Sequence, residues 1–95
     1  METAQYQLIE KEAIANMHFP ENDVLNSKEE KALRTADLNT AMSLGNLEHS
    51  KIRIYFEDSV SPKVVDTTVW GVTDKRVILK QSIMIPIHRI VRIKF

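Results

Sequence analysis

Residues 51–56 read Lys-Ile-Arg-Ile-Tyr-Phe, and this stretch decides the class of the fold. Apolar Ile52, Ile54 and Phe56 alternate with the remaining side chains, which predicts a strand with one buried and one solvent-facing side. Val, Ile and Thr dominate the sequence from here to Phe95, and their branched Cβ atoms favour a pleated backbone over a helix. The C-terminal half is therefore expected to form a sheet.

Turn sequences divide this half into five short strands. The expected strands are residues 51–56, 63–73, 77–80, 83–87 and 90–95. Gly71 should mark a bend or bulge in the second of them, because glycine weakens a regular strand. Short connections are typical of an antiparallel meander, and so small a sheet buries its apolar face best by curling into a barrel. The expected core includes Ile54, Val69, Leu79 and Ile87.

The half before residue 49 is expected to be helical. In residues 4–17 apolar side chains recur at intervals of three and four, and Pro20 stops this first helix. A second helix is expected at residues 28–44. Ser27 and Glu30 form a capping box at its start, and Gly45 offers a left-handed residue at its end.

The second helix carries two apolar faces. One is a stripe formed by Ala32, Leu33, Ala36, Thr40 and Leu44. Leu38 and Met42 lie nearly opposite, and they are a candidate contact face for the first helix or for a second protomer. The alternative is that these two side chains simply face water.

The predicted fold class is α+β, with an N-terminal helical part followed by a five-stranded antiparallel small β-barrel of the SH3-like or Sm-like kind. Residues 1–26 are expected to form a helix and a loop whose order the sequence leaves open. Residues 27–95 are expected to form a single domain, with a helix at 28–44 and the barrel at 50–95.

Charge is distributed unevenly along a chain whose formal net charge is zero. Residues 1–48 carry nine acidic and four basic side chains, and residues 49–95 carry the reverse. The chain has no cysteine, so it has no disulfide, thiol nucleophile or thiolate metal site. Without a signal-like N-terminus or an apolar run of membrane-spanning length, a soluble cytoplasmic protein with no membrane insertion is expected.

Residues 85–93, Ile-Pro-Ile-His-Arg-Ile-Val-Arg-Ile, resemble the strand, single-turn kink and final strand that close small SH3-like and Sm-like barrels. The inhibitor of the Rho terminator and the barrel half of ribosome-maturation factors are of this type. The resemblance covers residues 49–95 and implies a barrel capped by the preceding helix. No functional motif comes with it.

Two other resemblances compete with the barrel. Residues 73–79 and 85–87 also resemble bacterial pleckstrin-homology domains, but those domains close with a C-terminal helix and residues 90–95 are strand-like. Residues 44–48, 67–70 and 85–90 resemble a set of short uncharacterised bacterial proteins, which implies no known activity.

The sequence carries no pattern for catalysis or for a cofactor. His18, His49 and His88 lie far apart without the spacing of metal ligands, so no metal is expected. Two glycines cannot form a glycine-rich phosphate loop. Glu57 and Asp58 are neighbours on an extended backbone and point to opposite faces. We therefore expect a protein that is not an enzyme.

Three binding hypotheses remain. The first is a protein-interaction or oligomerisation module, suggested by the opposite charges of the two halves and by the two-faced helix. The second is an Sm-like barrel that binds RNA or single-stranded DNA, and the third is a pleckstrin-homology-like binding domain. The candidate nucleic-acid or partner surface consists of Arg53, Tyr55, Trp70, Lys75, Arg76, Arg89 and Arg92.

Overall fold

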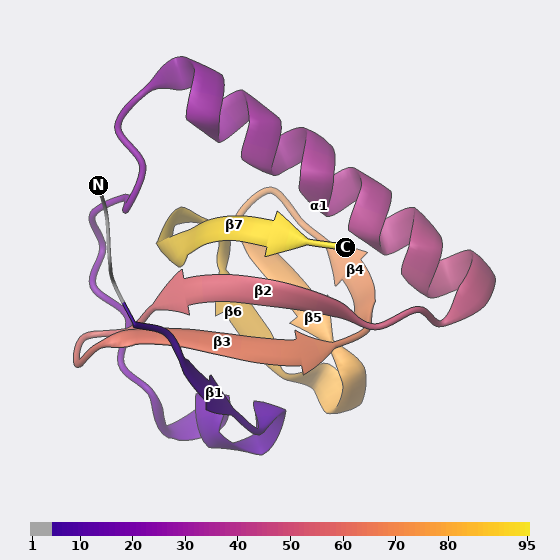
Figure 1. Cartoon of the computed structure of the whole chain (residues 1–95), viewed down its shortest axis with the longest axis horizontal. Helices are drawn as coiled ribbons and strands as arrows, with labels where there is room; N and C mark the ends of the chain where they lie inside the picture. The colour runs from indigo at the N-terminus through magenta and orange to yellow at the C-terminus, as the bar shows by residue number, and fades with distance from the viewer. Residues whose placement is uncertain (1–4) are drawn as a thin grey trace.

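The computed structural model describes residues 5–95, which form one long α-helix, three short 3-10 helices and seven strands (Figure 1). The strands are β1 (Gln7–Ile9), β2 (Ile52–Glu57), β3 (Pro62–Thr67), β4 (Val69–Val72), β5 (Arg76–Leu79), β6 (Met84–Pro86) and β7 (Ile90–Lys94). The helices are η1 (Lys11–Asn16), α1 (Lys28–Glu48), η2 (Lys80–Ser82) and η3 (Ile87–Arg89). None of these helices is both long enough and apolar enough to span a bilayer.

The strands form two sheets, so the prediction of a single five-stranded barrel is wrong. One sheet has the order β1-β3-β2-β7 and the other the order β4-β5-β6, and residues 5–95 contain no closed barrel. The difference arises at Thr68, where the strand predicted at 63–73 is interrupted. Before this residue β3 pairs with β2, and after it β4 pairs with β5, so the chain changes sheets. The register shift between Val69 and Gly71 confirms the predicted bulge.

Helices cover both gaps between the sheets. Figure 1 shows α1 lying across the gap between β7 of the first sheet and β4 of the second, and α1 contacts both strands. At the opposite gap η1 contacts β3 and β6. The core lies between the sheets and includes Ile54, Val69 and Leu79 as predicted, all fully buried, whereas Ile87 is half-buried at its margin.

The predicted N-terminal helix is wrong. Its first residue, Ala4, lies outside the described residues, and the rest of the segment forms β1 and η1. β1 runs parallel to β3, with Gln7 opposite Lys63, and the Tyr6 ring meets Tyr55 edge-on at a centroid distance of 5.0 Å. The backbone N–H and C=O groups of β1 form their hydrogen bonds with β3, a strand far along the chain. The spacing of apolar side chains in the sequence does not indicate such a partner.

Helix α1 begins where the sequence predicts and ends later. Ser27 Oγ accepts a hydrogen bond from the Glu30 N–H at 3.0 Å, which confirms the predicted N-cap. The helix continues through Gly45 to Glu48, and His49 takes the left-handed conformation (φ 53°) that was expected of Gly45. Gly45 therefore has another role.

The buried face of α1 consists of Arg34, Leu38, Ala41 and Gly45. Leu38 packs in the core and Met42 packs against it, so this predicted contact face is used within the chain. Most of the opposite stripe is exposed, including Leu33 at 63%. Gly45 explains why this face of α1 is the buried one. The helix backbone lies so close to β4 there that a Cβ at position 45 would overlap the Val69 carbonyl oxygen.

We predict that Gly45→Ala destabilises the fold, although alanine favours a helix by about 1 kcal/mol. The new methyl group forces α1 away from β4, and we expect the free energy of unfolding to fall by about 1–3 kcal/mol in urea titrations. Gly71→Ala is the matched control, because its Cβ would lie at an ordinary 3.6 Å from Ile78 Cδ1 and Gly71 has no positive φ. Equal stability of the two variants would contradict the role assigned to Gly45.

Candidate functional site

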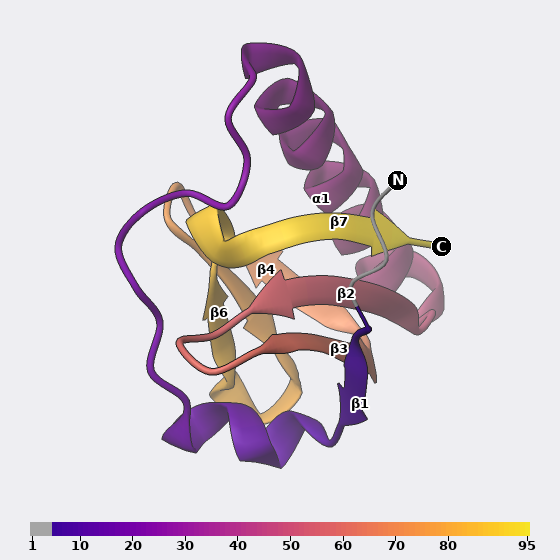
Figure 2. The same ribbon diagram turned by 60° about the vertical axis from the view of Figure 1, so that its left-hand side comes forward.

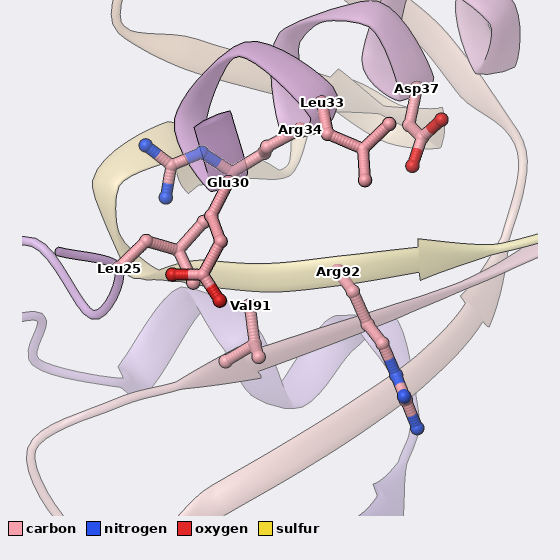
Figure 3. Close-up of a pocket in the computed structure, with 7 residues that line it drawn as sticks. All are labelled: Leu25, Glu30, Leu33, Arg34, Asp37, Val91 and Arg92. Atoms are coloured by element: carbon pink, nitrogen blue, oxygen red, sulfur yellow. The ribbon is translucent and has the colours of Figure 1, made fainter. Parts of the chain in front are cut away.

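A groove of about 290 Å³ lies between α1 and β7 (Figure 3). Its lining residues are Leu25, Glu30, Leu33, Arg34, Asp37, Val91 and Arg92. β7 is the last strand of its sheet, and no strand within residues 5–95 pairs with its outer side. The groove thus combines an apolar wall with an unpaired strand edge.

A bulge in β7 shapes the floor of this groove. Phe56 of β2 pairs with Ile90 and Tyr55 pairs with Arg92, so Val91 is an extra residue in β7. As a result Val91 and Arg92 project to the same side of the strand, as Figure 3 shows, instead of alternating. The bulge adds an apolar side chain to the groove, while the backbone edge continues toward Lys94.

Arg34 closes one end of the groove. Its side chain is 5% exposed, and Nη1 donates to the Ile90 carbonyl oxygen at 2.9 Å. Nη1 and Nη2 also donate to the two carboxylate oxygens of Asp23, at 3.0 and 2.9 Å. Asp23 Oδ1 in turn accepts the Leu25 N–H at 2.8 Å, which positions Leu25 in the groove wall.

The Asp23 carboxylate is stabilised in its charged form. The hydrogen bonds from Arg34 lower the pKa of Asp23 below its ordinary value, against the opposing effect of burial, and the Leu25 N–H lowers it further. The ion pair therefore persists at neutral pH and joins the segment before α1 to the helix.

The same segment is fixed to β7 through η3. Figure 2 shows it running from η1 along the side of the sheets to the start of α1. Arg89 Nη1 donates to the Asn22 carbonyl oxygen at 2.7 Å, and the Val24 N–H donates to the His88 carbonyl oxygen at 2.9 Å. His88 Nε2 lies 2.9 Å from the Pro20 carbonyl oxygen, so this nitrogen carries the donated proton.

The structure divides the seven predicted surface residues among several places. Arg53, Tyr55 and Arg92 share the outer face of the first sheet, where Tyr55 lies opposite Arg92 and Arg53 opposite Lys94. Arg89 does not belong to a surface: it is 6% exposed and its Nε donates to the Glu57 carbonyl oxygen at 3.0 Å.

The remaining three residues lie away from this face. Trp70 is the bulged residue of β4 in the other sheet and is 54% exposed. Lys75 and Arg76 follow Thr73, between the strands predicted at 63–73 and 77–80, and both of their backbone N–H groups donate to Thr73 Oγ1. The structure therefore contains no single surface that unites all seven residues.

The three cations of the sheet face have no acidic partner within residues 5–95. Arg53, Arg92 and Lys94 are exposed and form no ion pair there. The Arg92 guanidinium lies 4.8 Å from the Tyr55 ring centroid, and this cation–π contact holds it over the sheet. We call these three residues the basic ladder.

Several residues of the groove and of the basic ladder are not among the predicted site residues. Lys94 could have been found, because it follows Arg92 by two positions and so shares its face of the strand. Leu33 belongs to one of the two predicted apolar faces of the second helix, and Leu25 lies in residues 1–26, for which a helix and a loop are predicted. Neither position carries a local signal for a groove, because each becomes a wall only when α1 lies beside β7.

No group of three or more histidine, cysteine or acidic side chains in the described part of the chain is arranged to hold a metal ion. The buried carboxylate Asp58 has a structural role: it accepts the N–H groups of Val60 and Ser61 and pairs with Lys63 Nζ at 3.2 Å. Burial alone would raise the pKa of Asp58, but these donors lower it below its ordinary value.

Comparison with protein-family models, with curated proteins and with solved structures gives no match to this chain. The chemistry of the groove and of the basic ladder is therefore the basis for a function.

We predict that Asp23→Asn lowers the free energy of unfolding at pH 7 by about 2–3 kcal/mol, because it leaves the buried Arg34 guanidinium without its counter-charge. The pKa of Asp23 is lowered in the folded protein, so its stabilising contribution is complete above the unfolded pKa of about 3.9 and is lost as the pH falls below it. Stability in Asp23→Asn should therefore fall less steeply in acid.

Denaturant titrations between neutral and acidic pH measure both effects. Asp66→Asn is the matched control, since Asp66 is exposed and forms no ion pair within residues 5–95. An Asp23→Asn variant as stable as Asp66→Asn at pH 7 would show that the Asp23–Arg34 pair does not hold the groove together.

Proposed function

We propose that this chain is a non-catalytic protein-interaction module that binds an extended segment of a partner protein along the free edge of β7. The observation that supports this most is the outer edge of β7, with which no strand in the described residues pairs, lying beside a groove with an exposed leucine, Leu33. An unpaired strand edge presents backbone donors and acceptors that a further strand can satisfy.

Strand addition divides affinity and specificity between two sets of contacts. Main-chain hydrogen bonds to β7 provide affinity, and side chains of the added strand alternate between the sheet face and the groove. The Ile90 carbonyl is already bound by Arg34, so pairing starts beyond it and extends toward Lys94. The Arg34 contact therefore sets the register of the bound segment.

A different protein fits this edge better than a second copy of the chain. In the antiparallel registers with most overlap, two β7 strands would place Arg92 opposite Arg92 or Lys94 of the other copy. Like charges directly opposite each other destabilise a strand pair. This argument disfavours oligomerisation through β7.

Nucleic-acid binding has less support than protein binding. Arg53, Tyr55 and Arg92 do lie together, but the Tyr55 ring is half-buried, with Arg92 against it and Tyr6 at its edge. Base stacking needs an accessible ring face. Trp70, the other candidate ring, lies in the second sheet. No contact favours the pleckstrin-homology-like interpretation over strand addition.

We infer that the module works in the cytoplasm. The chain has no cysteine, so its stability does not depend on an oxidising compartment.

The test is selection of binding peptides from a random peptide library displayed on phage, followed by synthesis of the tightest peptide. N-methylation of the alternate amides that face β7 should weaken its binding about tenfold or more, because each methyl group removes a main-chain hydrogen bond. N-methylation of the other amides should have little effect. Fluorescence anisotropy of the labelled peptides measures both series.

Leu33→Asp and Leu47→Asp form a matched pair of protein variants. Both leucines are exposed on α1, at 63% and 80%, but only Leu33 lines the groove. Binding should weaken about tenfold in Leu33→Asp and stay unchanged in Leu47→Asp, with circular dichroism showing that both variants fold. Peptides that bind equally to both variants, or equally after either pattern of N-methylation, would refute strand addition at β7.

A further inference from the structure

We propose that the segment bound along β7 alternates acidic and aliphatic residues, with its acidic side chains over the basic ladder and its aliphatic side chains against α1. This inference rests on the proposed function and specifies the chemistry of the partner.

The basic ladder has no acidic partner within residues 5–95. Arg53 and Lys94 lie directly opposite each other on neighbouring strands, and Arg92 lies two residues from Lys94 on the same face. Like charges in such positions destabilise a sheet unless a counter-charge is added. Asp66 lies opposite Arg53 on its other side but forms no ion pair with it.

Protection of the sheet edge explains only part of this ladder. Cations on an edge strand such as β7 discourage unwanted pairing, which accounts for Arg92 and Lys94. Arg53 lies on β2, an interior strand, where no edge needs protection. A ladder that extends from the edge to the next strand is suited to binding an anionic strand laid beside it.

Arg92 is already positioned for such a ligand. Its guanidinium is held 4.8 Å from the centroid of the Tyr55 ring, on the solvent-facing side of the sheet. Less side-chain freedom is then lost when a carboxylate binds. An arginine can donate two parallel hydrogen bonds to one carboxylate, which favours glutamate or aspartate at this position of the partner.

The α1 side of the groove favours aliphatic side chains over acidic ones. Leu33 of α1 and Leu25 of the preceding segment provide apolar surface, and Glu30 and Asp37 of α1 line the same groove (Figure 3). These two carboxylates repel acidic side chains and leave aliphatic ones as the favoured contacts of Leu33. Because successive side chains of a strand point to opposite faces, the two preferences together require alternation.

The probe is a labelled peptide of about eight residues in which glutamate and valine alternate. One matched peptide has the same composition with the glutamates and valines in separate blocks, and another has lysine in place of glutamate. The alternating acidic peptide should bind about tenfold or more tightly than either, and 0.5 M NaCl should weaken its binding.

Charge reversal in the protein provides the decisive comparison. The double variant Arg92→Glu, Lys94→Glu should lose the acidic peptide and gain the lysine peptide, a reversal of preference of about a hundredfold. Lys75→Glu, Arg76→Glu is the matched control in the 73–76 turn and should leave the preference unchanged. All four side chains are exposed, and the Arg92→Gln, Lys94→Gln variant serves if charge reversal prevents folding.

The outcomes separate the inference from the proposed function. Selected peptides that bind with the N-methylation pattern of strand addition but lack alternating acidic residues would refute the partner chemistry and leave strand addition standing. The same holds if charge reversal does not change the preference between the acidic and the lysine peptide. If no peptide binds and a single-stranded oligothymidylate binds in a manner that depends on Arg92 and Lys94, the ligand is a nucleic acid and both proposals fail.

Discussion

The buried guanidinium of Arg34 connects three parts of the chain. It lies on α1, pairs with Asp23 in the preceding segment and donates to the Ile90 carbonyl oxygen at the start of β7. Because a buried cation is costly without partners, this arrangement is strongly favoured over one that leaves the guanidinium unpaired. The groove depends on this arrangement, since Arg34 bonds both to Ile90 of β7 and to Asp23, which in turn accepts the Leu25 N–H.

The other end of α1 is positioned by the absence of a side chain. Gly45 allows the helix backbone to approach the Val69 carbonyl, while Leu38 fills the core between the two contacts. An ion pair at one end and close packing at the other hold the helix across the gap between the sheets. The helix therefore closes the core and contacts β7, and no strand within residues 5–95 pairs with the outer edge of β7.

Local patterns predicted those features that depend on neighbouring residues. The alternation in β2, the bulge next to Gly71, the turn after the strand predicted at 63–73 and the cap at Ser27 all follow from short-range geometry. The same patterns misplaced the first helix, and they left open which of the two apolar faces of α1 is buried. β1 depends on a partner more than fifty residues away along the chain, opposite Lys63, and the face of α1 depends on contacts with β4 and Ile90. Of the candidate surface, Arg53, Tyr55 and Arg92 were brought together because β2 pairs with β7, whereas Arg89 was drawn into the interior.

By itself the sequence determined that the chain is α+β, which stretches become strands in its second half, and that the acidic and basic side chains are divided near residue 49. Only the tertiary structure decided that the strands form two sheets and that α1 buries Arg34 and Gly45. It also decided that no strand within residues 5–95 pairs with the outer edge of β7, which lies beside an apolar wall. The reason is that strands pair through backbone groups, which are nearly the same in every residue. The sequence therefore specifies where a strand forms more clearly than it specifies which other strand it pairs with.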